Sequence, residues 1–248
     1  MIIVKSEQEL ELMRISGKVT AYILMELNDF IRPGISTLDI DRHVEKIIRD
    51  NGMEPTFKGY GGFPASVCAS INEEVVHGIP SEYRMLHEGD IISIDVGSTY
   101  EGYVSDAART YPVGDVGETA KNIINAAEQG FFEGLKYCRK GFRISDISHA
   151  VQKKVEELGF GVIRDYVGHG VGRNMHEEPQ IPNYGRPGRG PRIAEGMCLA
   201  IEPMITEGTF KCRTLDNGWT VVTQDGGLAA HYENTVAISD DEPEVLTL

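Results

Sequence analysis

Two stretches of the chain repeat one pattern: EGDIISIDVG, residues 88–97, and EGMCLAIEPM, residues 195–204. In each stretch a Glu-Gly pair leads into an apolar run that ends in Ile and a carboxylate, which is Asp95 in the first copy and Glu202 in the second. The two carboxylates lie 107 residues apart (202 − 95). Two like carboxylates on equivalent apolar strands predict a site that forms where two half-domains meet.

The same offset aligns a second pair of stretches. At this offset, residues 32–52 align with residues 139–159. The two sequences are RPGISTLDIDRHVEKIIRDNG and RKGFRISDISHAVQKKVEELG. One offset that aligns two separated stretches is hard to obtain by chance, and two copies are too few for a solenoid. We therefore expect residues 1–248 to form a single catalytic domain, with pseudo-repeats at about 6–115 and 116–240.

The composition limits the class of protein. Hydrophobic residues make up 41% of the chain, enough for a sizeable core, and no run approaches the ~18 apolar residues of a membrane span. The N-terminal residues lack an apolar signal region, and the four cysteines show no CxxC spacing, which is typical of a reduced intracellular protein. A net charge of −14 disfavours DNA binding through the overall field. We expect a cytoplasmic monomer with no DNA or membrane partner.

The spacing of apolar residues predicts the secondary structure. Ser6 and Glu9 form a capping box that opens a helix, and Pro33-Gly34 ends it. Further helices are expected at about Leu38–Asn51, Glu118–Tyr137 and Ser145–Leu158. After each helix pair, β-branched runs predict strands at residues 67–71, 91–96, 103–111, 162–167, 197–206, 219–223 and 232–238. Two helices followed by strands in each half indicate an α+β fold, with helices backing an antiparallel sheet.

The first half places two aspartates on adjacent strands. Residues 91–110, IISIDVGSTYEGYVSDAART, predict a hairpin, and with Tyr100-Glu101 as its turn Asp95 and Asp106 would face each other directly. Two bare carboxylates at such a distance repel by a few kcal/mol at an effective dielectric of about 20. Two exposed strand ends would be the simplest explanation of an isolated pair. Because the strand around Asp95 is apolar, a cation between the carboxylates is the better interpretation.

The second half adds acidic and imidazole groups. Glu202 in LAIEPM and Glu233 in HYENTVAI each lie in an apolar run that predicts a buried strand, and DYVGHGVGRNMHEEPQ contains His169 and His176. Either carboxylate alone would more often be an ion-paired core residue, but four in apolar strands weaken that interpretation. The glycines of GHGVG could also form a phosphate-binding loop, although such a loop must open a helix and Pro179 follows closely.

Two Asp, two Glu and one His form an oxygen-rich ligand set with a single nitrogen. This set suits two divalent ions such as Co, Mn or Fe better than a structural zinc, with zinc as an alternative. Four carboxylate charges balance two divalent cations. Paired metals ~3.5–4 Å apart hold a bridging hydroxide and polarise a carbonyl, so the set predicts hydrolysis.

Five motifs carry a resemblance to a known family. They are CASINEEVVHGIP (68–80), IDVG with GYVSD (94–106), GHGVGRNMHEEPQ (168–180), AIEPM (200–204) and WTVVTQDGGLAAHYENTV (219–236). Across essentially its whole length the chain resembles bacterial type I methionine aminopeptidases, which have the pita-bread (creatinase-like) fold. The resemblance implies removal of the initiator methionine from nascent proteins whose second residue is small. The implied reaction is attack of a metal-bridged hydroxide on the first peptide carbonyl.

The resemblance also implies roles for single residues. It makes five residues the ligands of two divalent ions: Asp95, Asp106, His169, Glu202 and Glu233, of which Asp106 and Glu233 bridge. It makes His77 and His176 the histidines that contact the scissile peptide and stabilise the oxyanion, and Glu202 the proton carrier. From the residues alone, His77 before Gly-Ile-Pro could equally cap a turn.

The methionine pocket implied by the resemblance is apolar. Its residues map to Tyr60, Phe63, Cys68, His77 and Trp219, with His176 also contacting the substrate. From the residues alone, the GYGGF stretch and the single tryptophan could be ordinary core. Phe63 stands where a tyrosine is common in the family, and Met175 where an aromatic residue is common.

Rival functions stay open at this point. A Xaa-Pro peptidase shares the fold and ligands, and SDAART (105–110) is similar to that branch, but such enzymes carry an extra N-terminal domain for which we expect no room. A catalytically inactive pita-bread scaffold would lose ligands, whereas all five are present. A type II enzyme would carry a long helical insertion between His176 and Glu202.

An irregular stretch, NYGRPGRGPR at residues 183–192, concentrates positive charge on an acidic chain. Most such loops are merely solvated. A second hypothesis is that Arg173, Arg186, Arg189 and Arg192 form a basic edge that contacts ribosomal RNA near the emerging chain.

Overall fold

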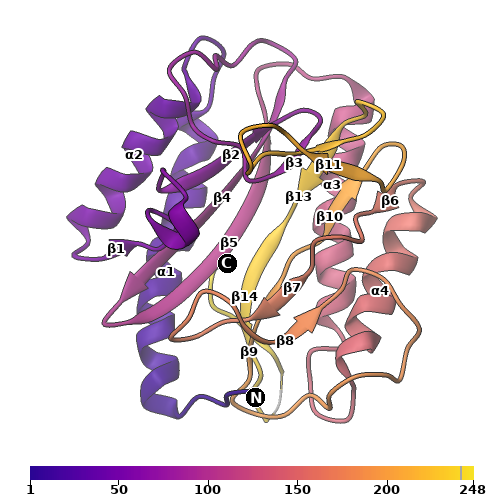
Figure 1. The fold of residues 1–248 in the computed structure, drawn as a ribbon. Helices are drawn as coiled ribbons and strands as arrows, with labels where there is room; N and C mark the ends of the chain where they lie inside the picture. Colours follow the sequence, from indigo (N-terminus) through magenta and orange to yellow (C-terminus); the bar gives the residue numbers. More distant parts are fainter. Residues whose placement is uncertain (241) are drawn as a thin grey trace.

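The chain forms two helices and then strands, twice over (Figure 1). The computed structural model describes residues 1–240 and 242–248. Its first half contains α1 (Glu7–Phe30), α2 (Thr37–Asp50), β1 (Glu54–Pro55), a 3₁₀ turn (Tyr60–Gly62), β2 (Val67–Ile71), β3 (Glu74–Val76), β4 (Ile91–Tyr100) and β5 (Tyr103–Pro112). Its second half begins with α3 (Glu118–Leu135) and α4 (Ile144–Glu157). The strands that follow are β6 (Gly161–Val162), β7 (Gly168–Gly170), β8 (Glu177–Ile181), β9 (Cys198–Ile201), β10 (Met204–Thr206), β11 (Cys212–Thr214), β12 (Val221–Thr223), β13 (Ala229–His231), β14 (Glu233–Ala237) and β15 (Glu244–Val245).

The helix starts follow from capping chemistry. The Ser6 hydroxyl accepts from the Glu9 amide while the Glu9 carboxylate accepts from the Ser6 amide, so the predicted capping box opens α1. Ser36 and Asp39 repeat this arrangement at the start of α2. All four predicted helices are confirmed, with ends that lie within three residues of those expected.

One antiparallel sheet joins the two halves. Seven of its strands run in the order β1-β4-β5-β14-β9-β7-β8, while β2 pairs with β4 and β15 pairs with β14. The halves meet where β5 pairs with β14, with Ala108 opposite Glu233 and Ala107 opposite Asn234. We call this β5–β14 contact the central pairing. Two three-stranded sheets, β13-β10-β6 and β11-β12-β3, complete the strand arrangement.

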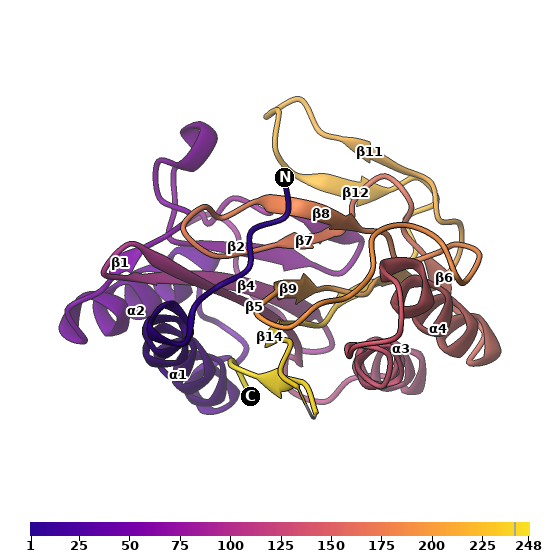
Figure 2. The same ribbon diagram turned by 90° about the horizontal axis from the view of Figure 1, so that it is seen from below.

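The helices cover one face of the large sheet and leave the other face for a site. Figure 2 shows both helix pairs below the sheet, with β11 and β12 on the opposite side. On β4, Ile92, Ile94 and Val96 are buried in the core cluster under α1 and α2. Because side chains alternate along a strand, Asp95 points to the face away from the helices. The α+β architecture with helices backing an antiparallel sheet is therefore confirmed, and none of the described helices is long and apolar enough to cross a membrane.

The hairpin register differs from the one expected. The turn is Glu101-Gly102, so Tyr100 pairs with Tyr103, Asp95 lies opposite Ala108, and Asp106 lies opposite Gly97. Both turn residues have positive φ, 46° and 79°, as a two-residue hairpin turn requires, and glycine tolerates that conformation best. The prediction that Asp95 and Asp106 face each other directly was wrong. Since the pairing moves by two residues, both carboxylates still share one face.

The strand predictions for the second half need further corrections. The expected strand at 197–206 is two strands, β9 and β10, which belong to different sheets. The expected strand at 162–167 is limited to β6, and the one at 219–223 begins at Val221. Seven short strands, β1, β3, β7, β8, β11, β13 and β15, were not predicted, because runs of two to five residues carry little periodicity.

Candidate metal centre

Glu233 and Glu202 reach the same region from the second half. Glu233 is the first residue of β14 and therefore lies at the central pairing. Glu202 lies between β9 and β10, so the prediction that it sits inside a strand was wrong. Pro203 lacks an N–H for a strand ladder, which explains the break. The Asn183 side-chain amide donates to the Glu202 carbonyl at 2.9 Å and fixes the backbone there.

His169 faces these carboxylates from β7. Its Nε2 lies 3.6 Å from Asp106 Oδ2 and 3.5 Å from Glu202 Oε1. Its Nδ1 lies 2.9 Å from the Gly170 carbonyl, and an N–H donated there leaves the Nε2 lone pair free toward the carboxylates. This is the orientation of a metal-binding imidazole whose other nitrogen is held by the backbone.

The glycines around His169 permit close strand packing. A Cβ on Gly168 would lie 2.4 Å from the Ala200 carbonyl oxygen, and one on Gly170 would lie 2.3 Å from the Glu178 carbonyl oxygen. β7 therefore packs so closely between β8 and β9 that only glycine fits at positions 168 and 170. The segment is a strand and opens no helix, so the phosphate-loop interpretation of GHGVG is excluded.

One cavity of about 220 Å³ collects every residue that the sequence proposed for the site. Its lining includes the five proposed ligands, the two histidines expected to be catalytic and the expected pocket residues: Tyr60, Phe63, Cys68, His77, Asp95, Asp106, His169, His176, Glu202, Trp219 and Glu233. The apolar side chains of Phe57, Val76, Tyr166, Met175 and Met204 also line it. Of these, only Met175 had been singled out from the sequence. The others lacked a distinctive motif, and only the fold brings them together.

The aromatic and imidazole rings of the cavity contact one another at its apolar end. The Trp219 ring meets Phe63 edge-on at 5.1 Å and His77 at 6.3 Å between ring centroids. His77 also meets Tyr166 edge-on at 5.7 Å. Its backbone has φ of 60°, a costly conformation for a residue other than glycine. His77 therefore lines the cavity with a strained backbone, and its contact with the scissile peptide stays a prediction.

His176 lies beside His169, with ring centroids 4.4 Å apart. The Tyr60 hydroxyl lies 2.9 Å from His176 Nδ1. Burial lowers the pKa of His176 to about 4, and it lowers the pKa values of His77 and His169 as well. All three rings are therefore neutral near pH 7.

The acidic groups of the cavity favour protonation when no cation is bound. Burial raises the pKa of Asp106 to about 7, and the pKa values of Asp95, Glu202 and Glu233 rise well above their ordinary range. Neighbouring carboxylates add to the rise for Asp95, Glu202 and Glu233. Asp106 and Glu233 are each 1% exposed, whereas Asp95 keeps partial exposure toward the cavity. Like charges held this close in the interior call for a cation or for bound protons.

Unpaired polar atoms identify the same cluster. In the described part of the chain, five buried side-chain polar atoms lack a hydrogen-bond partner, and four of them are Asp95 Oδ1, Asp106 Oδ1, Glu233 Oε1 and His231 Nε2. Buried polar groups are rarely left unpaired, so this concentration fits an ion-binding site. Oxygen donors with imidazole nitrogen suit first-row divalent ions, and the residues present therefore fit such a group.

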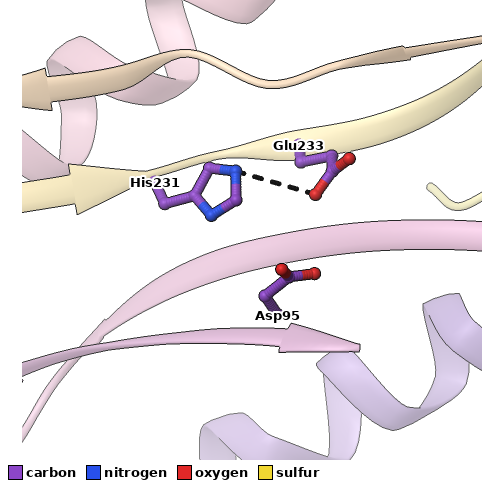
Figure 3. A group of neighbouring side chains, drawn as sticks. All are labelled: Asp95, His231 and Glu233. Atoms are coloured by element: carbon purple, nitrogen blue, oxygen red, sulfur yellow. Dashed lines mark ion pairs between the residues drawn. The ribbon is translucent and has the colours of Figure 1, made fainter. Parts of the chain in front are cut away.

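Two possible ligand groups share Glu233. Donor atoms of Asp106, His169 and Glu233 lie within 4.8 Å of one another, and so do those of Asp95, His231 and Glu233. Figure 3 shows the side chains of Asp95, His231 and Glu233 gathered close together, although they come from three different strands, β4, β13 and β14. The sequence had supplied only one nitrogen, and His231 was missed. Its place two residues before Glu233 was the available signal, because alternate strand residues share a face.

Comparison with known proteins assigns this arrangement to a family. Residues 11–240 match the model of metallopeptidase family M24. The chain belongs to metallopeptidase family M24. A methionine aminopeptidase of Clostridium acetobutylicum is 56% identical over 248 residues, which cover 100% of this chain and 99% of that protein.

Solved structures agree with this assignment. A methionine aminopeptidase from Thermotoga maritima superimposes with a TM-score of 0.98 at 46% identity, covering 100% of this chain and 99% of that one. A prolidase from Pyrococcus furiosus, at 22% identity and a TM-score of 0.78, shares the fold and is covered over 65% of its length. The predicted resemblance to bacterial methionine aminopeptidases and the pita-bread fold of this M24 chain are therefore confirmed.

A glycine substitution tests how β7 holds His169. Gly170→Ala should destabilise the M24 chain by about 1–3 kcal/mol, because its Cβ has no room beside the Glu178 carbonyl. Thermal unfolding measures the loss. Gly117→Ala is the matched control, since Gly117 has φ of −67° and a Cβ there meets nothing within 4 Å. Equal melting temperatures for the two variants would contradict close packing at β7.

A pH series in chelator tests the buried carboxyl of Asp106. Because its folded pKa of about 7 lies above the ordinary 3.8, its stabilising contribution is fully present below pH ~4 and is lost as pH rises through about 7. Asp106→Asn lacks this titration. The melting temperature of the wild type relative to that of Asp106→Asn should therefore fall by several degrees between pH 5 and pH 8. A difference that stays constant with pH would refute the raised pKa.

Proposed function

We propose that this chain is a methionine aminopeptidase, which removes the initiator methionine of nascent proteins when the second residue is small. One observation carries the proposal: four carboxylates and three histidines converge in a single cavity whose remaining wall is apolar. The acidic part suits hydrolysis assisted by metal ions, and the apolar part suits a methionine side chain. Membership of family M24 and relatives named methionine aminopeptidase support the same activity.

Two divalent ions are the proposed cofactors. Asp95, Asp106, His169, Glu202 and Glu233 are the proposed ligands, with Asp106 and Glu233 shared between the two ions. The four carboxylates of the cavity, whose charges would balance two divalent cations, support a pair of ions over a single one. The mixture of carboxylate and imidazole among the proposed ligands favours Co, Mn or Fe, with Zn as an alternative.

When bound, such ions lower the pKa of water and polarise the substrate carbonyl. Glu202 is the proposed proton carrier. Its carboxyl group is only 9% exposed, and its pKa is raised well above the usual range, mainly by burial. A carboxyl group with such a pKa can take a proton from the attacking water and pass it to the leaving amine.

His176 and His77 are proposed to act on the scissile peptide as neutral imidazoles. If the Tyr60 hydroxyl donates to His176 Nδ1, the ring proton stays on Nε2, which can donate to the developing oxyanion. Because burial lowers the pKa of His176 to about 4, the ring adds no positive charge beside the carboxylates. Contacts with Trp219 and Tyr166 hold the ring of His77 at the apolar end of the cavity.

The methionine side chain is proposed to lie among Tyr60, Phe63, Cys68, His77 and Trp219. Burial raises the pKa of the Cys68 thiol well above its ordinary value, so Cys68 serves as a neutral, weakly polar wall. Phe63 offers a ring edge to Trp219 without a hydroxyl group. Met175, which is buried at 7% exposure, also lines the cavity with a flexible thioether.

The setting proposed for this activity is the cytoplasm, with nascent N-termini as substrates. We further propose that residues 1–248 act as one catalytic domain and work as a monomer. The large sheet supports the single domain, because its strands come from both halves and its ligands lie on both sides of the central pairing.

A substrate panel tests the proposed activity. After treatment with chelator and reloading with Mn(II) or Co(II), the protein should release Met from Met-Ala-Ser and leave Gly-Pro peptides intact. A peptide with a bulky second residue should be cleaved at least ~100-fold more slowly, because the closed cavity excludes it. Free methionine is measured by chromatography.

Glu202→Gln serves as the catalytic control for this panel, since it keeps the shape of the side chain and removes its proton chemistry. We expect it to lose ~100-fold or more of kcat. Cleavage of Gly-Pro in place of Met-Ala-Ser would indicate a Xaa-Pro peptidase. Bound metal without any peptidase activity would indicate an inactive scaffold.

The loop at residues 183–192 supports a proposed contact with ribosomal RNA. Arg186, Arg189 and Arg192 are exposed. The loop is tied to the start of α4, because Arg143 donates to the Gly190 carbonyl at 2.6 Å and the Gly188 amide donates to Asp146 at 2.6 Å. Arg173 instead lies over the Tyr103 ring at 4.6 Å and 3.8 Å from Glu9, so we place it outside the proposed contact.

Charge removal tests this contact. Serine at positions 186, 189 and 192 should reduce co-sedimentation with ribosomes at low salt, because each phosphate contact adds to the salt-dependent affinity. Cleavage of Met-Ala-Ser should stay unchanged. Lys46, Lys136 and Lys153, which are exposed elsewhere, provide a control with the same loss of charge. If both triple variants co-sediment equally, the loop makes no specific contact.

A further inference from the structure

His231 lies against the acidic cluster and has no role in the proposed chemistry. It is the last residue of β13 and is 2% exposed. Thr110 holds its backbone on both sides, since the Thr110 hydroxyl accepts from the His231 amide and donates to the His231 carbonyl, both at 2.9 Å. The position of the ring is therefore set by the sheet.

The ring nitrogen of His231 is directed at two carboxylates. Its Nε2 lies 3.6 Å from Glu202 Oε2 and 3.6 Å from Glu233 Oε2. Within residues 1–240 and 242–248, this nitrogen has no hydrogen-bond partner. A buried polar atom left unpaired costs about 1–3 kcal/mol, so a small shift that pairs it with either carboxylate would be favourable.

His231 differs from His169 in its position relative to the cavity, which His169 lines. Among the described residues that line the cavity, Glu202 and Glu233 are present and His231 is not. The imidazole approaches the carboxylates from β13, which pairs with β10 and is not part of the large sheet. A neutral imidazole has one N–H, and with that proton on Nε2 the ring can donate toward either carboxylate.

We propose that His231 is a positioning residue, which donates a hydrogen bond from Nε2 to the Glu202–Glu233 pair and holds both carboxylates in their metal-binding orientation. This inference rests on the proposed role of Glu202 and Glu233 as ligands. Carboxylates that bind metals are themselves held by hydrogen bonds from outside, and loss of such a partner weakens metal binding about 10–100-fold.

Two substitutions of His231 distinguish the effect of losing a hydrogen-bond donor from the effect of losing side-chain volume. His231→Gln keeps an N–H donor at a similar reach, whereas His231→Leu keeps much of the volume and has no donor. In calorimetric titration of the chelated protein with Mn(II), we expect His231→Leu to bind about 10–100-fold more weakly than the wild type. His231→Gln should stay within a few-fold of the wild type. His87→Leu, at an exposed histidine, controls for the loss of an imidazole.

Thermal unfolding with and without Mn(II) tests a merely structural role. Because His231→Leu keeps much of the volume, a residue that only filled the core would leave the melting-temperature increase on adding Mn(II) at the wild-type value. The melting-temperature increase on adding Mn(II) should be smaller in His231→Leu than in the wild type.

The possible outcomes distinguish this inference from the proposed function. If the wild type binds no divalent ion, the proposed metal centre fails and the inference fails with it. If the wild type and His231→Leu bind Mn(II) equally, only the inference is overturned. X-ray absorption that counts two imidazoles per protein, together with weak binding by His231→Gln, would make His231 a direct ligand and would also overturn the positioning role.

Discussion

The repulsion among four carboxylates in one cavity is the constraint on which the rest of the structure depends. Asp95 and Asp106 come from the β4–β5 hairpin, and Glu202 and Glu233 come from the second half. Without a cation, burial favours their protonated forms, and the pKa of Asp106 rises to about 7. Such a site favours the binding of cations, because a bound cation offsets the free-energy cost of burying ionised carboxylates close together.

Much of the site could be predicted because it depends on short-range patterns. The alternation along β4 sets Asp95 apart from Ile94 and Val96, and the capping box at Ser6 marks the start of α1. The shared offset of Asp95 and Glu202 predicted one site supplied by two halves, and both residues line the same cavity. Such features depend on neighbouring residues, so the sequence alone contains them.

The missed features depend on contacts between distant parts of the chain or on small details of turns. Gly102 moves the hairpin turn by one residue and places Asp106 diagonal to Asp95. Pro203 divides an apolar run into β9 and β10, so Glu202 lies just past a strand end. His231 becomes relevant only because β13 and β14 bring it beside Glu202, a residue nearly thirty positions earlier. Apolar wall residues such as Met204 carry no chemical signal until the cavity exists.

The central pairing also affects when the site can form during synthesis. β14 occupies the middle of the large sheet, between β5 and β9, yet the ribosome makes it after every other strand of that sheet except β15. Until residues 233–237 leave the exit tunnel, the β4–β5 hairpin and the β9 region have no strand to join them. A partly synthesised chain therefore cannot capture metal at the complete centre. Metal binding at the full set of four carboxylates therefore has to wait until β14 has been made.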